Sequence, residues 1–411
     1  MHAGGAMKKL TLDEITALEA QHVVTTYKRQ PVAFVRGSGS RLYDVDGREY
    51  LDFISGIGVT SLGHAHPGLA AAIADQASTL LHTSNLYYHP LQGQVAARLT
   101  KISGMARAFF ANSGTEAVEG CLKFARRYWY TKGNNERTAF VALEHAFGGR
   151  TMGSLSVTWD EHYRTPFQPL IGPVTFVKPG DAAALEAAVT DRTAAIIAEP
   201  IQGEGGIRPL SNDFAQAIRD ICRRTGTLCI ADEVQSGLGR TGHPFYFPVL
   251  GLEPDLVSVG KALGSGVPVG ATLMSERVAQ AISPGDHGTT YGGNLLACRA
   301  ALFFLEQLMD TGLLEHVNTA GRLFEQRLRA LALKHPVIVE TRGVGLMRGL
   351  QLAIDATPII DSARERGLLV NRTNEKVVRL LPPLNVEVAD IDRATDILDA
   401  VFAAVGAEVS A

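Results

Sequence analysis

The stretch Leu228-Cys-Ile-Ala-Asp232-Glu-Val-Gln235 is a short apolar run that ends in charged and polar residues. A second run of the same kind, Asp255-Leu-Val-Ser-Val-Gly-Lys261, ends in a lysine 29 residues after Asp232. Near-continuous apolar runs are typical of buried parallel strands, and ligands bind just beyond the carboxyl ends of such strands. We therefore expect the carboxylate of Asp232 and the amine of Lys261 to meet in one crevice.

This pairing predicts a pyridoxal phosphate site. Enzymes that use pyridoxal phosphate need a lysine that forms a Schiff base with the cofactor. They also need an acid that keeps the pyridine nitrogen protonated. Lys261 and Asp232 are the candidates for these two roles.

Apolar strand-like runs alternate with helix-period segments from about residue 70 to residue 300. The expected strands are Ala106–Ala111, Thr138–Leu143, Val174–Val177, Ala194–Ala198, Leu228–Ala231, Leu256–Val259 and Gly270–Met274. Such alternation predicts an α/β domain with a mostly parallel central sheet.

The C-terminal part has a different pattern, which predicts a smaller α+β domain. Its expected elements are a long helical stretch at Leu295–Leu333, strands near Val337–Thr341, Leu346–Ile354 and Val377–Leu381, and a helix near Thr357–Glu365. Two strand-like pieces near the N-terminus, Ala33–Arg36 and Arg41–Val45, are expected to pack on this domain. We therefore divide the chain into an N-terminal segment (1–65), a large domain (66–299) and a small domain (300–411).

The composition is that of a globular protein, with 411 residues, 46% hydrophobic residues and a net charge of −3. A chain of this length is expected to form two domains. It has no basic block, no apolar run of about 18 residues and no signal peptide, so we expect no nucleic acid, no membrane and a cytoplasmic location. Its four cysteines lack metal-ligand spacing and are expected to be reduced core thiols. Residues 1–6 read either as a leader or as a cloning remnant.

A turn between a predicted strand and an amphipathic helix contains Asn112-Ser113-Gly114-Thr115-Glu116. A small, flexible turn at a helix N-terminus exposes backbone N–H groups that can bind phosphate, and the hydroxyls of Ser113 and Thr115 can add hydrogen bonds. An ordinary helix N-cap is the alternative interpretation.

Two further loops follow predicted strands. In the first, Phe147 stands beside a glycine pair, which suits a flat cofactor, and Arg150 suits a carboxylate. In the second, Glu199 and Glu204 place two carboxylates at the end of a strand. Packing and solvated surface positions are the alternatives for these residues. The three histidines His64, His66 and His145 lack metal-ligand spacing, so we expect structural roles and no metal site.

Taken together, these segments resemble the class III aminotransferases, which are fold-type I pyridoxal-phosphate enzymes. The resemblance extends from Tyr27 to Phe402 and rests on motifs in the family's order. The motifs are Asn112-Ser-Gly-Thr-Glu116, Glu199-Pro-Ile-Gln-Gly-Glu-Gly-Gly206, Asp232-Glu-Val-Gln-Ser-Gly-Leu-Gly-Arg-Thr-Gly242, Gly260-Lys-Ala-Leu-Gly264 and His287-Gly-Thr-Thr-Tyr-Gly-Gly-Asn294.

The resemblance implies a role for each motif residue. Lys261 would form the Schiff base and then move a proton between the substrate carbon and C4′ of the cofactor, and Asp232 would pair with the pyridinium nitrogen. Gln235 would bind the phenolic oxygen and Phe147 would stack on the ring. The full set expected to contact the cofactor is Ser113, Gly114, Thr115, Phe147, Asp232, Val234, Gln235, Lys261 and Thr290.

The resemblance also implies how substrates bind. Arg150 would hold the carboxylate far from the reacting carbon, and Arg379 would hold the α-carboxylate of glutamate or 2-oxoglutarate. Glu204 would cover Arg379 when the other substrate is bound. Thr290 would reach the phosphate of the neighbouring subunit, with Thr289 near the substrate, which implies a homodimer with shared active sites.

Within the family, the segments His82–Tyr88 and Gly367–Asn371 most resemble the acetylornithine aminotransferases. These pass the δ-amino group of N2-acetylornithine to 2-oxoglutarate in arginine biosynthesis, giving N-acetylglutamate 5-semialdehyde and glutamate. Ile57 stands where enzymes that act on free ornithine carry tyrosine, which fits an acylated substrate. Gly148 replaces the usual histidine or tryptophan, and we expect this change to widen the pocket near Arg150.

Other substrates and a non-catalytic function remain alternative interpretations of the sequence. Within the class, the substrate could be 4-aminobutyrate, succinylornithine or a carrier-protein-linked intermediate of lysine synthesis. A non-catalytic, cofactor-binding regulator is the remote alternative, although no basic helix-turn-helix segment flanks residues 27–402.

Overall fold

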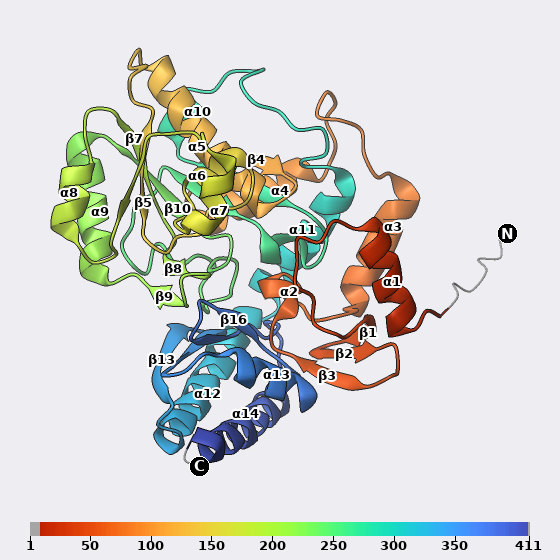
Figure 1. The fold of residues 1–411 in the computed structure, drawn as a ribbon. Helices are drawn as coiled ribbons and strands as arrows, with labels where there is room; N and C mark the ends of the chain where they lie inside the picture. Colours follow the sequence, from red (N-terminus) through yellow and green to blue (C-terminus); the bar gives the residue numbers. More distant parts are fainter. Residues whose placement is uncertain (1–8, 410–411) are drawn as a thin grey trace.

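The computed structural model describes residues 9–409, so residues 1–6, read above as a leader or remnant, lie outside it. A seven-stranded sheet forms the centre of the larger part (Figure 1). Its strands, in spatial order, are β4 (Arg107–Ala111), β12 (Gly270–Met274), β11 (Leu256–Val259), β10 (Leu228–Asp232), β7 (Thr193–Ala198), β5 (Ala139–Leu143) and β6 (Val174–Val177). Only β12 runs against its neighbours, so the mostly parallel sheet is confirmed, and each predicted strand is present within one residue.

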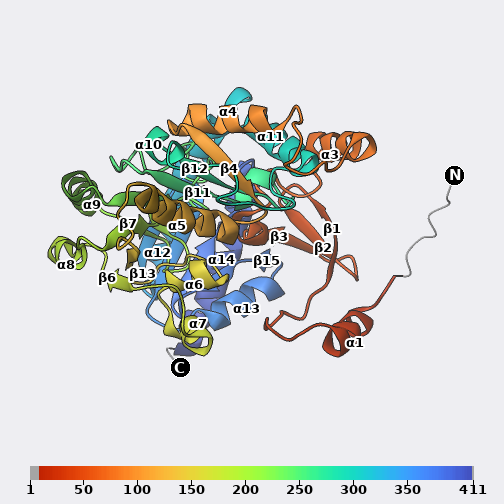
Figure 2. The ribbon, with the colours of Figure 1, turned by 90° about the horizontal axis from the view of Figure 1, so that it is seen from above.

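The sheet is buried on both faces, which explains why its strands are apolar at nearly every position. Ala142 of β5 and Ile230 of β10 pack with α5 (Gly114–Thr131), while Val141 and Cys229, one residue earlier in each strand, pack on the opposite side. There they meet α9 (Asn212–Thr225). Viewed from above, α5 lies on one side of the sheet, and α4 (Gln92–Ser103) and α11 (Leu295–Asp310) lie on the other (Figure 2).

The C-terminal part contains a second, antiparallel sheet. Its strands, in spatial order, are β13 (Ile338–Val344), β14 (Met347–Leu352), β17 (Val377–Leu380) and β16 (Asn371–Thr373). The helices α12 (Leu313–Lys334), α13 (Thr357–Glu365) and α14 (Val388–Val409) accompany it (Figure 1). A long helix was expected over Leu295–Leu333, but it is broken at Gly312, where φ is 82°. The apolar period continues across this break, whereas the backbone does not.

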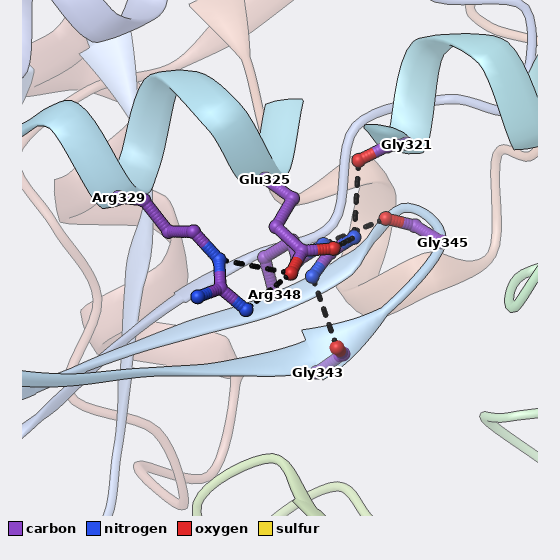
Figure 3. A network of polar contacts seen from close by, with 6 residues as sticks. All are labelled: Gly321, Glu325, Arg329, Gly343, Gly345 and Arg348. Atoms are coloured by element: carbon purple, nitrogen blue, oxygen red, sulfur yellow. Dashed lines mark hydrogen bonds and ion pairs between the residues drawn. The ribbon is translucent and has the colours of Figure 1, made fainter. Parts of the chain in front are cut away.

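One buried arginine joins α12 to the β13–β14 hairpin (Figure 3). Arg348 donates hydrogen bonds to the carbonyls of Gly321, Gly343 and Gly345 at 2.8 to 3.0 Å and to Glu325 at 3.1 Å. Glu325 also accepts hydrogen bonds from Arg329, one helical turn away. The guanidinium is therefore satisfied despite its burial, and it fixes the helix on the hairpin.

The N-terminal segment shares a sheet with the C-terminal part. Strands β1 (Phe34–Ser38), β2 (Arg41–Asp44) and β3 (Glu49–Asp52) form a meander, and β3 pairs in parallel with β15 (Leu368–Leu369). The boundaries at residues 65 and 299 stay predictions. Among residues 9–409, none of the helices has the length and hydropathy that a membrane span requires.

Candidate active site

A cavity of about 230 Å³ lies beyond the carboxyl ends of the parallel strands. It is lined by Gly114, Thr115, Phe147, Gly148, Gly149, Arg150, Glu199, Glu204, Asp232, Val234, Gln235 and Lys261. Strands β10 and β11 are hydrogen-bonded neighbours, with Asp232 opposite Ser258. The structure therefore brings Asp232 and Lys261 together in one crevice.

Lys261 follows β11 after one glycine and begins a short 3-10 helix with φ at 39°, in the left-handed region. Its amine has no hydrogen-bond partner within residues 9–409. Burial lowers the pKa of Lys261, although the negative charges of Glu204 and Asp232 act to raise it. A lysine with a lowered pKa has a larger neutral fraction, which is the form that attacks a carbonyl or accepts a proton.

Asp232 offers one free oxygen to the cavity. Its Oδ1 accepts hydrogen bonds from the Val234 N–H at 3.1 Å and from the Ser258 hydroxyl at 2.9 Å. Within the described chain, Oδ2 accepts none. Burial raises the pKa of Asp232 to about 6, so a cation placed against Oδ2 would stabilise the charged carboxylate.

Glu199 connects two loops of the site, a role that the sequence did not indicate. It is buried, and its carboxylate accepts the N–H of Phe147 at 2.9 Å and the N–H of Gly203 at 3.0 Å. Burial, together with the charge of Asp232, raises the pKa of Glu199 to about 8. Glu199 thus connects the Phe147 loop to the turn that carries Glu204.

The N-terminus of α5 faces the same cavity. Ser113 is its N-cap and accepts the Glu116 N–H at 3.3 Å, and it does not line the cavity. The Thr115 hydroxyl accepts the N–H groups of Arg150 at 3.1 Å and of Thr151 at 3.3 Å. The N–H groups of Gly114 and Thr115 have no acceptor within residues 9–409, so they remain available to an anion.

Gly114 is required by close packing. A Cβ at this position would lie 2.5 Å from Cγ1 of Val234. Val234 follows Asp232 by two residues and also lines the cavity. The α5 turn and the end of β10 therefore approach each other as closely as a glycine allows.

Arg379 lies on β17 with only 1% of its side chain exposed. It donates to Glu204 at 2.5 Å, to Asn371 at 3.2 Å and to Gln235 at 3.4 Å. Burial acts to raise the pKa of Glu204, but the charge of Arg379 and its hydrogen bond keep that pKa below its ordinary value. The pair is therefore ionic, and Glu204, which is 37% exposed, is the partner with room to move away.

Arg150 is exposed at the mouth of the cavity, where a second cavity of about 680 Å³ begins. Phe147, Arg150 and Glu204 line both cavities. The expectation that Gly148 widens this region is wrong. A Cβ on Gly148 would point at Val157 Cγ2 (2.5 Å) and at the carbonyl oxygen of Ser154 (2.6 Å), so the space is already filled.

Besides Ser113, four residues named from the sequence are not among those that line the cavity of their own chain, namely Ile57, Thr289, Thr290 and Arg379, the last of which contacts the lining residues Glu204 and Gln235. The Thr289 hydroxyl accepts a hydrogen bond from Asn112 at 3.2 Å, and the Thr289 carbonyl accepts one from Asn85. Thr290 is exposed on the same loop, and Ile57 is 41% exposed. Their predicted roles stay predictions.

The residues present fit pyridoxal phosphate. The cavity combines a free lysine amine, a carboxylate with one open oxygen, two free N–H groups at a helix N-terminus and an aromatic ring at its wall. Within residues 9–409, no group of three or more histidine, cysteine or acidic side chains is placed to hold a metal ion.

Sequence and structure comparisons agree with this geometry. Residues 23–402 match the model of the aminotransferase class-III family. The chain is 45% identical to the acetylornithine aminotransferase of Methanocaldococcus jannaschii, over 94% of this chain and 97% of that protein, and 44% identical to that of Aquifex aeolicus, over 92% and 98%. The ornithine aminotransferase of Toxoplasma gondii, solved with pyridoxal phosphate at partial occupancy in its active site, superposes with a TM-score of 0.93 at 32% identity, covering 98% of this chain and 97% of that one. The chain therefore belongs to the class-III aminotransferases, and its cofactor is pyridoxal phosphate.

Proposed function

We propose that this chain transfers the δ-amino group of N2-acetylornithine to 2-oxoglutarate, giving N-acetylglutamate 5-semialdehyde and glutamate in arginine biosynthesis. The names of the curated relatives support acetylornithine as the amine donor. The observation that carries the proposal is the ion pair between Glu204 and the buried Arg379, beside an open Arg150.

These two arginines suit an amine donor with one carboxylate and a keto acid acceptor with two carboxylates. N2-acetylornithine presents a terminal amine and one carboxylate, which Arg150 would hold while Glu204 covers Arg379. 2-Oxoglutarate presents two carboxylates, so Glu204 would move aside and Arg379 would bind the α-carboxylate. Because an unpaired buried guanidinium is costly, the alternation keeps Arg379 paired in both half-reactions.

The chain's own residues would prepare the proton transfer. When bound, pyridoxal phosphate supplies an electron sink for the substrate carbon. Lys261 Nζ would accept the proton that this carbon releases and hold it for return. Asp232 Oδ2 would keep the pyridine nitrogen protonated, while the N–H groups of Gly114 and Thr115 and the ring of Phe147 would fix the cofactor's position.

We propose further that the enzyme is a cytoplasmic homodimer in which Thr290 completes the partner's phosphate site. Its exposure outside its own cavity supports this. Mixing Lys261→Ala subunits with Thr290→Ala subunits tests the arrangement, because one site of the mixed dimer would then contain no defect. Recovery of wild-type cofactor affinity in that site is expected, whereas no recovery would rule out the shared site.

A substrate panel tests the specific assignment. The values of kcat/KM for N2-acetylornithine, N2-succinylornithine, ornithine and 4-aminobutyrate are measured with 2-oxoglutarate as the acceptor. We expect a clear preference for N2-acetylornithine. A higher value for any other amine would reassign the chain within its family.

A further inference from the structure

The two arginines of the site are stabilised in different ways. Arg379 is paired with Glu204, but Arg150 has no acidic partner within 4.0 Å in residues 9–409. Its guanidinium carbon instead lies 3.6 Å from the ring centroid of Tyr163 and 5.7 Å from that of Phe147. Tyr163 lines the outer cavity of about 680 Å³.

An aromatic ring and a carboxylate have different consequences for an arginine. The ring face attracts the cation through its quadrupole, without accepting hydrogen bonds from the edge of the guanidinium. A carboxylate binds that same edge through two parallel hydrogen bonds. An arginine that lies flat on a ring therefore keeps its N–H donors free for a substrate carboxylate.

Both partners of this contact are fixed by local structure. The Arg150 N–H donates to the Thr115 hydroxyl, which ties the loop to α5. Tyr163 lies in the short helix α7 (Glu161–Arg164), whose N-cap Asp160 accepts the His162 N–H at 2.9 Å. Arg164, at the end of α7, donates to the Trp159 carbonyl at 3.1 Å. Tyr163 is thus held beside Arg150.

We propose that Tyr163 is a positioning residue that holds Arg150 ready for the distal carboxylate of each substrate. Its ring keeps the guanidinium at the mouth of the cavity, where the four acidic residues of the outer cavity would otherwise compete for it. These are Asp160, Glu161, Glu204 and Glu375. The inference rests on the proposed function in one respect, namely that Arg150 binds carboxylates.

The test compares two keto acids, 2-oxoglutarate and 2-oxopentanoate, which differ only in the distal carboxylate. Each is added to holoenzyme that has already received the amino group from a donor. Tyr163→Leu and Tyr163→Gln remove the aromatic ring, and Tyr163→Phe keeps it. Loss of a cation–π contact is expected to raise KM for 2-oxoglutarate by about 2- to 30-fold, with kcat little changed. KM for 2-oxopentanoate should not move, and Tyr163→Phe should behave as wild type.

Tyr130→Leu is the matched control, because Tyr130 holds Arg127 at 5.3 Å on the outer end of α5, away from both cavities of the site. It should leave both KM values unchanged. Equal increases for both keto acids, no increase in Tyr163→Leu or Tyr163→Gln, or an equal increase in Tyr163→Phe would each overturn the inference. Only the keto acid acceptor is varied, so the result does not depend on which amine is the donor. Failure of the proposed role of Tyr163 can therefore be distinguished from failure of the acetylornithine assignment.

Discussion

The Glu204–Arg379 pair makes a quantitative prediction about the two half-reactions. Glu204→Gln keeps the volume of the side chain but replaces a hydrogen bond between charged groups with one to a neutral amide. A solvent-exposed ion pair contributes roughly 0–1 kcal/mol, whereas removing one partner of a buried pair costs roughly 3–5 kcal/mol. The loss here lies between these limits, at about 1–2 kcal/mol, because Arg379 is buried and Glu204 is 37% exposed.

This difference should appear in only one of the two half-reactions. A substrate carboxylate no longer has to displace Glu204, so KM for 2-oxoglutarate should fall by roughly 5- to 30-fold. In the amine half-reaction Arg379 has the same neutral partner before and after the substrate binds, so kcat/KM for N2-acetylornithine should change little. Stopped-flow absorbance of the cofactor measures each half-reaction separately. Glu375→Gln, an exposed position on the outer cavity, is the control, and equal changes in both half-reactions would show that Glu204 does not compete with the substrate for Arg379.

Three further predictions concern the rest of the site. Asp232→Asn should lower kcat by roughly 10²- to 10³-fold, measured by steady-state kinetics, because the cofactor nitrogen loses its anion. Gly148→Ala should lower the free energy of unfolding by about 1–3 kcal/mol in denaturant titrations, since its Cβ meets Val157. Burial raises the pKa of Glu199 to about 8, so the protonated acid favours the folded apoprotein, and thermal stability should fall as pH rises from about 5 through 8. Glu199→Gln should weaken this dependence, and an unchanged slope would contradict the assigned pKa.

The central sheet and the pair of Asp232 and Lys261 could be predicted from the sequence, because each strand and the residue that follows it lie in one short segment. Each central strand is a short apolar run; β10 ends in Asp232, and Lys261 follows the last residue of β11 after one glycine. The break in the C-terminal helix could not be predicted from periodicity. The apolar stripe continues on either side of Gly312, whereas the backbone leaves the helical conformation at Thr311 and Gly312.

The rest of the site depends on contacts between segments far apart in the chain. Glu199 connects two N–H groups 56 residues apart, and Ser258 reaches Asp232 across a strand pair. The ring of Tyr163 meets Arg150 from a separate helix, α7, 13 residues later in the chain. Ser258 was detectable as the one polar residue within the apolar strand β11, whereas Tyr163 gave no signal.

The most direct test of the site is to locate the cofactor on the chain. The holoenzyme is reduced with borohydride and digested, and the modified peptide is identified by mass spectrometry. We expect one pyridoxyl group per chain, on Lys261, and none in the Lys261→Ala variant. A pyridoxyl group on another lysine, or none in the wild-type protein, would contradict the assignment of the cavity between β10, β11 and α5 as the active site.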